Sequence, residues 1–345
     1  MEVLVTGAFG NVGRSTVDAL LEAGHRVRCF DVQTPANVRA AKRLGGRVEV
    51  DWGDLRRPED VERAVRGQEV VIHLAFIIPK LSATGFESED HPDWAEEVNV
   101  RGTQNLLQAM CRQPLPPRIV FASSYHIYGR TQDQPPPRTV ADPPQPIENY
   151  ARHKVACEAL IRGSGLEWAI LRLAASLPIA MRMDPGMFDV PPDNRMEYVH
   201  TRDAGLAFAR AAACDEVWGK VLLIGGGPRC QYFYREIMTR VLDGMGVGAL
   251  PDGAFASVPF ATDWLDTAES QRLLCYQRHT LDDYVRDMVA RLGVRVWLVR
   301  AFRPLVRFIL LQQSPYAHAG RTPWLGTVLQ GLKSLKRGPA RLPAR

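Results

Sequence analysis

The chain has 345 residues, of which 46% are hydrophobic and 23% are charged. This composition excludes a disordered or collagen-like protein, and the length allows about two domains. Six widely spaced cysteines without a Cys-x-x-Cys pair argue against a disulfide framework or a metal site and fit a reducing compartment. The net charge of +5 is uneven, because residues 288–345 contain eleven Lys or Arg and no Asp or Glu. The first 287 residues are therefore mildly acidic.

Short β-branched segments alternate with helical patterns over the first 225 residues. Such alternation predicts an α/β fold built on a Rossmann-type, doubly wound parallel sheet. The expected strands are Val3–Val5, Val27–Phe30, Val48–Val50, Val70–Leu74, Arg118–Phe121, Trp168–Arg172 and Val221–Ile224. The expected helices lie near 11–23, 35–44, 58–66, 94–111, 148–163 and 202–213.

The regular alternation is interrupted by two proline-containing segments, 132–146 and 184–195, which we expect to be loops. A smaller, mostly helical lobe would cover the carboxyl edge of the sheet, where ligands bind in such folds. Its helices are expected near 232–245, 268–274 and 281–292. The predicted organisation is a Rossmann domain of residues 1–173 plus 198–225, a substrate-binding lobe of residues 174–197 plus 226–290, and a basic C-terminal extension of residues 291–345.

A glycine-rich turn directly follows the first expected strand and opens the first helix, with the sequence Thr6-Gly-Ala-Phe-Gly-Asn-Val-Gly13. Gly7 permits the tight turn, Gly10 lets the backbone approach a diphosphate, and Gly13 lets the helix pack against the strand. The diphosphate then meets free N–H groups and the positive end of the helix dipole. The turn therefore predicts a dinucleotide site, whose expected contacts here are Gly7, Phe9, Gly10, Asn11, Val12 and Gly13.

An acidic residue, Asp31, ends the second expected strand, eighteen residues beyond Gly13. A carboxylate there can accept hydrogen bonds from both ribose hydroxyls and would repel a 2′-phosphate, so the pattern favours NAD over NADP. Asp54 follows the third strand, where it can bond the adenine amino group while Leu55 packs on the ring. The alternative for Asp54 is an acid that only flanks a helix.

The fourth expected strand ends in His73, Leu74 and Ala75. Small residues at this point would leave room for the cofactor. Leu74 and Ala75 are among the expected cofactor contacts. His73 has apolar neighbours, and we interpret it as a core histidine rather than a ligand.

Hydroxyl and amine side chains then follow in an order that indicates a proton-transfer site. Ser123 and Ser124 end the fifth strand, and Tyr150 and Lys154 lie four residues apart on the next expected helix. At that spacing the two side chains stand on one helix face, with Cβ atoms about 5–6 Å apart. A nearby ammonium favours the phenolate, so we expect Lys154 to lower the pKa of Tyr150 by ~1–3 units. Ser124 would hold the substrate oxygen against Tyr150.

With these features the sequence resembles the extended short-chain dehydrogenase/reductase family, in particular its NAD-dependent epimerase/dehydratase group. The resemblance covers about residues 1–290 and implies Tyr150 as the catalytic acid/base, Lys154 as its partner and Ser124 as the hydroxyl that orients substrate. It places Asn99 near the cofactor pocket and implies a homodimer packed through the helices near 94–111 and 148–163. The motifs that carry it are the turn at 6–13, Asp31, Asp54-Leu55, His73-Leu-Ala75, Asn99-Val-Arg-Gly-Thr103, Ser123-Ser-Tyr-His-Ile-Tyr-Gly129, Tyr150…Lys154, Leu171-Arg172…Pro178 and Tyr198-Val-His-Thr-Arg-Asp203-Ala.

Two departures from the family pattern narrow the chemistry. Dehydratases of the family carry Asp-Glu after the catalytic hydroxyl, where this chain has Tyr125 and His126, so dehydration is disfavoured. Many nucleotide-sugar epimerases carry an arginine-led run before the final helices, whereas the corresponding stretch 258–266 has no arginine. Arg195, Arg229 and Arg235 are the candidate substitutes, or else surface charges.

Apolar residues flank the same region of the sequence and admit two interpretations, an apolar substrate pocket or core between the lobes. They are Phe76-Ile-Ile-Pro79 after the fourth strand and Met181, Met183, Met187 and Phe188 in the smaller lobe.

Residues 294–311 combine thirteen apolar residues with four arginines and Pro304, which should start or kink a helix. Four charges in this segment argue against a spanning helix. A basic amphipathic segment with aromatics suits peripheral contact with an anionic membrane, and the alternative is a C-terminal helix packed on the body. No recognition module accompanies the charge, so no nucleic acid is expected. The N-terminus shows no signal-peptide pattern, and we expect a cytoplasmic protein, with a peripheral place at the inner membrane face as the alternative.

The sequence thus predicts an NAD-dependent enzyme that oxidises a secondary alcohol with Tyr150 as acid/base. The leading hypothesis is epimerisation of a nucleotide sugar. The alternatives are net dehydrogenation or reduction of a hydrophobic, sterol-like or lipid-linked alcohol, and a catalytically silent NAD-binding scaffold.

Overall fold

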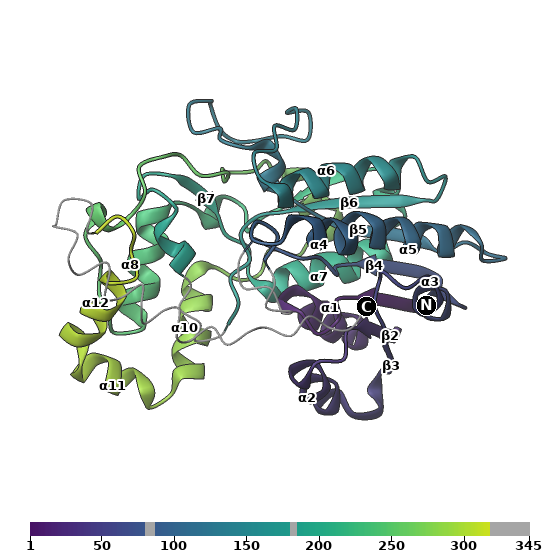
Figure 1. Cartoon of the computed structure of the whole chain (residues 1–345), viewed down its shortest axis with the longest axis horizontal. Coiled ribbons are helices and arrows are strands. Elements are labelled where there is room, and N and C mark those ends of the chain that lie inside the picture. The colour runs from purple at the N-terminus through teal and green to yellow at the C-terminus, as the bar shows by residue number, and fades with distance from the viewer. Residues whose placement is uncertain (80–86, 180–184, 318–345) are drawn as a thin grey trace.

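The computed structural model describes residues 1–79, 87–179 and 185–317, so the expected pocket residues Met181 and Met183 lie outside the described residues. Its centre is a seven-stranded, wholly parallel sheet in the order β3-β2-β1-β4-β5-β6-β8 (Figure 1). This arrangement confirms the predicted doubly wound α/β fold. The strands are β1 Glu2–Thr6, β2 Arg26–Asp31, β3 Glu49–Trp52, β4 Val70–His73, β5 Arg118–Ser124, β6 Trp168–Leu173 and β8 Val221–Ile224.

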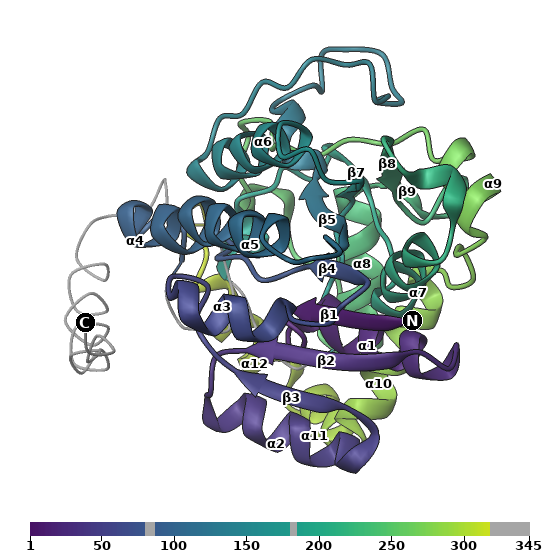
Figure 2. The same ribbon diagram turned by 90° about the vertical axis from the view of Figure 1, so that its right-hand side faces the viewer.

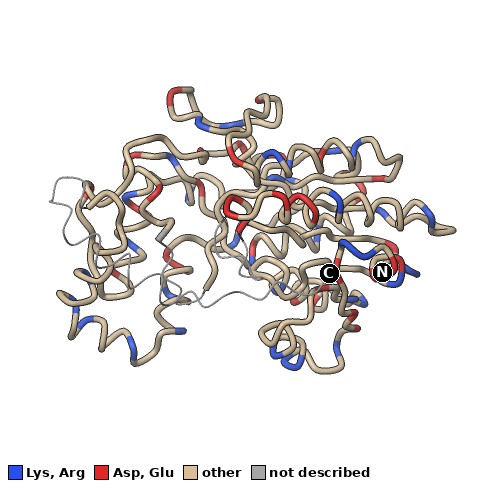
Figure 3. Tube along the Cα trace, viewed as in Figure 1, with Lys and Arg blue, Asp and Glu red and all other residues tan. Residues whose placement is uncertain are grey.

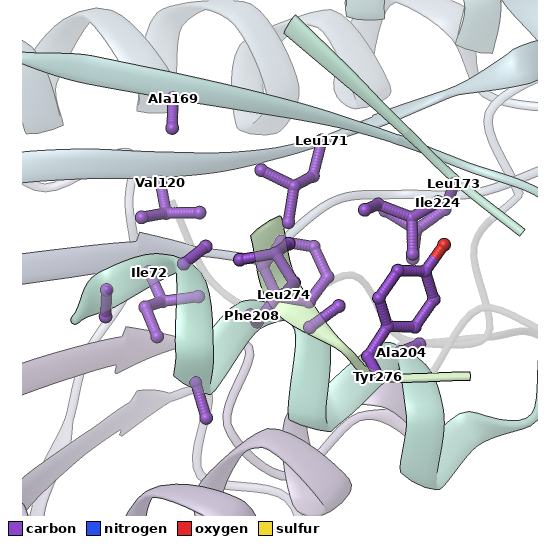
Figure 4. Close-up of a cluster of buried hydrophobic side chains, with 14 of the residues drawn as sticks. Ile72, Val120, Ala169, Leu171, Leu173, Ala204, Phe208, Ile224, Leu274 and Tyr276 are labelled. Carbon is purple, nitrogen blue, oxygen red and sulfur yellow. The ribbon is translucent and has the colours of Figure 1, made fainter. Parts of the chain in front are cut away.

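Helices cover both faces of this sheet (Figure 2). One face packs α1 Asn11–Glu22, α2 Pro35–Leu44, α7 Thr201–Ala212 and α9 Ala268–Leu274, and the other packs α3 Pro58–Val65, α5 Gly102–Cys111 and α6 Asn149–Arg162. On the first face Phe208 of α7 meets the apolar side chains of the central strands, with Leu274 and Tyr276 closing the cluster (Figure 4). Strands buried on both faces explain the continuous apolar runs in the sequence.

The helix expected near 94–111 is interrupted. It consists of α4 Pro92–Glu96, a π-helical turn at Glu97–Arg101 and α5. A single extra residue in a helical turn leaves no hydrophobic signal, so the sequence did not predict it. Such π-turns occur frequently at functional sites, and this one contains Asn99.

The smaller lobe lies beyond the carboxyl edge of the sheet, at the left of Figure 1. Its core brings together the side chains of α8 Tyr234–Gly244, α10 Leu281–Leu292, α11 Arg295–Ala301 and α12 Arg303–Leu311. A two-stranded antiparallel sheet, β7 Arg195–Glu197 with β9 Gln231–Phe233, leads into it. The sequence missed this sheet, because three-residue strands are too short for a period to show. The helix expected near 232–245 therefore begins two residues later. The predicted lobe boundaries stay a prediction.

The C-terminal segment 294–311 forms two short helices, and Pro304 lies in the first turn of α12, as expected. Within the described residues, no helix has the length and apolar character needed to cross a membrane.

A buried ion pair ties helix α6 to the middle of the sheet. Arg172 on β6 donates two hydrogen bonds of 2.9 and 2.8 Å to the carboxylate of Glu158 on α6, and the Ser123 hydroxyl donates a third of 2.6 Å. Both charged side chains are at most 6% exposed. Glu158 also meets Arg162, whose side chain is 43% exposed. Removing Glu158 would leave the Arg172 guanidinium buried without its counter-charge.

We therefore expect Glu158→Ala to lower the free energy of unfolding by ~3–5 kcal/mol, because a buried charge loses its partner. The control is Arg162→Ala, which removes the exposed side of the same cluster and should cost less than about 1 kcal/mol. Urea unfolding of both variants measures the difference. Equal losses in the two variants would contradict this account of the pair.

Candidate active site

The glycine turn between β1 and α1 has the backbone geometry that the sequence predicted. Gly7 has a φ of +68°, and a Cβ on it would lie 2.7 Å from the nitrogen of Ala75 at the end of β4. A Cβ on Gly13 would lie 2.1 Å from the Gly7 carbonyl oxygen. Gly10 precedes α1, so the first amides of that helix, which have no acceptor within the helix, face the turn. The turn is a compact cradle of backbone N–H groups.

Asp31 lies beside this cradle, where β2 ends. Its carboxylate accepts hydrogen bonds from the backbone N–H of Phe9 (2.9 Å) and Val32 (2.8 Å) and from the Asn37 amide (3.2 Å). Burial raises the pKa of Asp31 above its ordinary value, although the two backbone bonds favour the charged form. The turn and the carboxylate are thus fixed to each other, as a dinucleotide site requires, and these residues fit NAD.

The remaining expected cofactor contacts have partners of their own. The Asp54 carboxylate is bound by the Arg56 guanidinium at 2.6 Å, and Leu55 is buried against Gly102. The side-chain amide of Asn11 donates to the Ser176 carbonyl at 3.0 Å, which ties the start of α1 to the segment after β6. Their contacts with the cofactor stay predictions.

The end of β4 is fixed by the hydroxyl of Thr6. This oxygen accepts from the amides of Leu74 and Ala75, each at 3.2 Å, and lies 2.7 Å from Nδ1 of His73. His73 is buried, its Nε2 lies 3.0 Å from the Thr103 hydroxyl, and burial lowers its pKa to about 3. Its interpretation as a core histidine is confirmed.

Asn99 is buried and holds the backbone of the segment that follows β4. Its carboxamide accepts from the Ile77 N–H (2.7 Å) and donates to the Ile77 carbonyl (3.0 Å), so it holds the segment after β4 in place. Phe76, the residue before Ile77, turns its ring toward Lys154, and the Lys154 Nζ lies 3.4 Å from the ring centroid. The sequence could not show this contact, because it depends on the register of α6 against β4.

Ser124, Tyr150 and Lys154 come together at the carboxyl end of β5. The Ser124 side chain lies close enough to the Tyr150 hydroxyl to lower its pKa, and the Lys154 Nζ lies 5.6 Å from the centroid of the Tyr150 ring. Lys154 donates a 2.5 Å hydrogen bond to the carbonyl of Ala122 on β5. The juxtaposition predicted from the spacing is therefore present in the structure.

The protonation of this group differs from the sequence expectation. Burial raises the pKa of Tyr150 to about 12, against the lowering effect of the Ser124 hydrogen bond. Burial likewise lowers the pKa of Lys154 to about 7. The expected lowering of the Tyr150 pKa by Lys154 was wrong, because the Lys154 amine points to the Ala122 carbonyl and the ring of Phe76 while burial raises the Tyr150 pKa. The phenol is consequently protonated at neutral pH.

A cavity of about 510 Å³ opens beside this group, between the sheet edge and the smaller lobe. Its wall is mainly apolar, and the lobe contributes Met187, Met196, Ile237, Met238, Val241, Leu242, Met245, Phe260, Tyr284 and Met288. Polar residues gather at one end, where Glu89, His126 and Glu148 line the same space. A larger hollow of about 730 Å³ lies between α1 and α7. None of the three candidate catalytic residues lines either space, but the 510 Å³ cavity is lined by His126, whose ring meets the Tyr150 ring at 5.8 Å.

The polar end of the cavity contains a pair that the sequence reasoning did not single out. Nδ1 of His126 is hydrogen-bonded to the Glu148 carboxylate, and the His126 ring meets the Tyr150 ring edge-on at 5.8 Å. Glu89 accepts from the backbone amides of Asn149 and Tyr150 at the start of α6. The sequence signal that could have indicated this pair is the position of His126, two residues after Ser124.

The three arginines considered as diphosphate ligands lie away from the cavity, and two of them are engaged by other residues. Arg195 donates to the Asp263 carboxylate at 2.6 Å and to the carbonyls of Thr131, Gln132 and Gln134. Arg235 pairs with Asp252 at 2.9 Å, and Arg229 is exposed. None of the three lines the cavity beside Tyr150.

The model of the NAD dependent epimerase/dehydratase family matches residues 3–175, which is half of the chain. The chain belongs to this family. The match confirms the predicted family and enzyme class and the expected dependence on NAD.

Among curated relatives, this epimerase/dehydratase family member is 32% identical over 169 residues to a 3-beta-hydroxysteroid dehydrogenase of Mycolicibacterium neoaurum, covering 49% of this chain and 44% of that protein. It is 38% identical over 143 residues to UDP-glucose 4-epimerase 3 of Oryza sativa, covering 39% and 37%. The chain thus spans less than half the length of either of these two relatives.

Two solved structures resemble it over most of its length. One is a short-chain dehydrogenase/reductase superfamily protein from Agrobacterium tumefaciens with bound NAD, at a TM-score of 0.69 and 21% identity, covering 88% of this chain and 100% of that one. The other is UDP-glucuronic acid 4-epimerase from Bacillus cereus in complex with UDP-glucuronic acid and NAD, at 0.69 and 22%, covering 85% and 100%. At these identities the likeness shows the fold alone.

Gly13→Ala should weaken NAD binding by ~10–100-fold, because its Cβ displaces the Gly7 carbonyl and with it the cradle. Gly46→Ala is the matched control, since a Cβ there meets nothing within 4 Å. Isothermal titration of both variants with NAD measures the effect. Unchanged affinity in Gly13→Ala would show that the turn does not hold the cofactor.

Lys154→Met should raise the free energy of unfolding, on the order of 2 kcal/mol below about pH 7. The folded-state pKa of about 7 lies below the ordinary 10.5, so the cost of burying the ammonium is complete below pH 7 and disappears as the pH rises toward 10.5. Urea unfolding of wild type and variant across this range measures the difference. A difference that does not change with pH would contradict a buried ammonium.

Proposed function

We propose that this protein is an NAD-dependent oxidoreductase that interconverts a secondary alcohol and its ketone on a substrate with a largely apolar body. The observation that carries the proposal is the group of Ser124, Tyr150 and Lys154, which adjoins a mainly apolar cavity through His126.

Tyr150 would be the acid/base at the substrate oxygen. In reduction its phenol donates a proton to the carbonyl oxygen as the carbon gains hydride, and in oxidation the phenolate takes the proton back from the hydroxyl. The raised pKa of about 12 keeps the phenol in the donating form at neutral pH. Bound NAD supplies the hydride chemistry at the carbon.

Ser124 and Lys154 would position the reacting groups. The Ser124 hydroxyl lies near the Tyr150 side chain, whose pKa it lowers, and can hold the substrate oxygen at the same point. Lys154, anchored on the Ala122 carbonyl, would help to hold the cofactor beside the Tyr150 ring. The residues proposed to hold NAD are Gly7, Phe9, Gly10, Asn11, Val12, Gly13, Asp31, Asp54, Leu55, Leu74, Ala75, Asn99, Tyr150 and Lys154.

The cavity wall supports an apolar substrate. Five methionines and several branched or aromatic side chains line it, and methionine adapts its shape to irregular apolar ligands. A nucleotide diphosphate would call for cations in the wall, whereas Arg195, Arg229 and Arg235 lie outside it. Glu89, His126 and Glu148 can instead bind a hydroxyl or another small polar group of the substrate.

A nucleotide-sugar 4-epimerase is the second candidate, favoured by the similarity to UDP-glucose 4-epimerases. In that reaction the ketone turns over before its carbon regains hydride on the other face, with no net redox change. The same three residues would serve both reactions, so the substrate decides between them.

The proposal is tested by turnover across hydrophobic secondary alcohols, their ketones and a set of nucleotide sugars, with NADH and isomer ratio followed together. We expect NADH to form or disappear in proportion to an apolar substrate. Interconversion of sugars without net NADH would establish the epimerase instead. Absence of turnover with either class would favour a scaffold that only binds NAD.

Tyr150→Phe should lower kcat by ~10²–10⁴-fold while NAD affinity falls far less, because Phe keeps the ring and lacks only the proton-transferring hydroxyl. Steady-state kinetics with the active substrate and titration with NAD give the two values. Retention of wild-type kcat would remove Tyr150 from the mechanism.

A further inference from the structure

Helices α11 and α12 form a hairpin at the outer edge of the smaller lobe (Figure 1). Large apolar side chains of this hairpin are exposed to solvent. Trp297 is 70% exposed, Phe302 58% and Phe308 60%. The other large apolar residues of the hairpin that are exposed are Val294, Leu298, Leu305 and Ile309. Of the thirteen exposed large hydrophobic residues that we identify in the described part of the chain, seven thus fall within sixteen consecutive positions.

The exposed residues of α12 share one helix face. Phe302, Leu305 and Phe308 are spaced by three residues, and Ile309 follows Leu305 by four. The opposite face is fixed to the lobe. Val306 and Leu310 pack into its core, and Arg303 and Arg307 donate to the Val247 carbonyl at 3.0 and 3.2 Å. The apolar face is therefore held outward by an anchored inner face.

We propose that the α11–α12 hairpin docks this protein on the surface of a bilayer that contains anionic phospholipids. Aromatic and aliphatic side chains would enter the headgroup boundary, as in interfacial amphipathic helices. Arg295 and Arg300 are exposed on the same hairpin, and Figure 3 marks its basic positions. Residues 288–345 contain eleven basic and no acidic residues, so this whole end of the chain favours a negative surface.

A bilayer fits this surface better than a second copy of the chain does. Two copies facing each other through the hairpin would bring two basic, acid-free segments together. Charged residues are also depleted from the cores of protein interfaces, whereas arginines are interspersed along this hairpin. On a membrane the exposed Arg295 and Arg300 would meet phosphate groups, while Arg303 and Arg307 stay bonded to the Val247 carbonyl.

The hairpin also adjoins the candidate active site. Beneath α12 lies a hollow of about 230 Å³, lined by Val299, Val306, Ile309 and Leu310 together with Met245 and Val247. Met245 also lines the cavity beside Tyr150. Docking would thus place the bilayer next to the apolar cavity. It follows that the substrate is an amphiphile drawn from the membrane, a step that rests on the proposed function.

Flotation of the full chain with lipid vesicles tests the docking without requiring turnover. Wild type should bind phosphatidylcholine vesicles that contain phosphatidylglycerol and bind pure phosphatidylcholine vesicles at least about tenfold less well. The triple variant Trp297→Ser/Phe302→Ser/Phe308→Ser should lose at least about tenfold in binding to the anionic vesicles. Leu115→Ser is the matched control, since Leu115 is 85% exposed on the Rossmann domain, and it should bind like wild type.

A second variant, Arg295→Gln/Arg300→Gln, should reduce binding and weaken its dependence on salt. Unchanged binding in both multiple variants, or no binding of wild type to anionic vesicles, would overturn the proposal. So would a triple variant that sediments as a smaller species than wild type, because the apolar face would then be an interface between copies. If vesicles bind as expected but no apolar alcohol is turned over, docking stands and the proposed function fails.

Discussion

Helix α6 is anchored on the end of β5, and the chemistry of the site depends on this anchor. Lys154 reaches from the helix to the carbonyl of Ala122, and Tyr150, one turn earlier, lies beside Ser124 two residues further along the same strand. Glu158, one turn later, holds Arg172 on the neighbouring strand β6. Three successive turns of one helix are therefore fixed to the sheet. A phenol and an amine on a loop would not keep this register.

The parallel sheet makes the anchor useful, because it collects the ends of its strands at one edge. Thr6 of β1 pairs in register with Phe30 of β2 and His73 of β4, so the glycine turn, Asp31 and the segment after β4 start from adjacent points. The Thr6 hydroxyl and the Asn99 carboxamide then fix the backbone of that segment. The smaller lobe adds the apolar wall that the sheet edge lacks.

The sequence predicted the strands, the glycine turn and the placement of Tyr150 and Lys154 on one helix face. The pattern of apolar residues, the glycine spacing and the four-residue interval are all local properties of the sequence. It failed where the outcome depended on distant contacts. The direction of the Tyr150 pKa shift depends on the burial of its hydroxyl and on the orientation of Lys154 toward Ala122. The three-residue strands β7 and β9 and the π-turn around Asn99 are too short to leave a periodic pattern. The engagement of Arg195 by Asp263 likewise required the fold, since 68 residues separate the two.

The most direct test of the account is a crystal structure of the chain with NAD bound. We expect the diphosphate at the turn of Gly7, Gly10 and Gly13, the adenosine ribose at Asp31, and the nicotinamide end beside Tyr150 and Lys154, facing the apolar cavity. A cofactor bound with its nicotinamide away from Tyr150, or excluded from the turn, would contradict the assignment of this cleft as an active site.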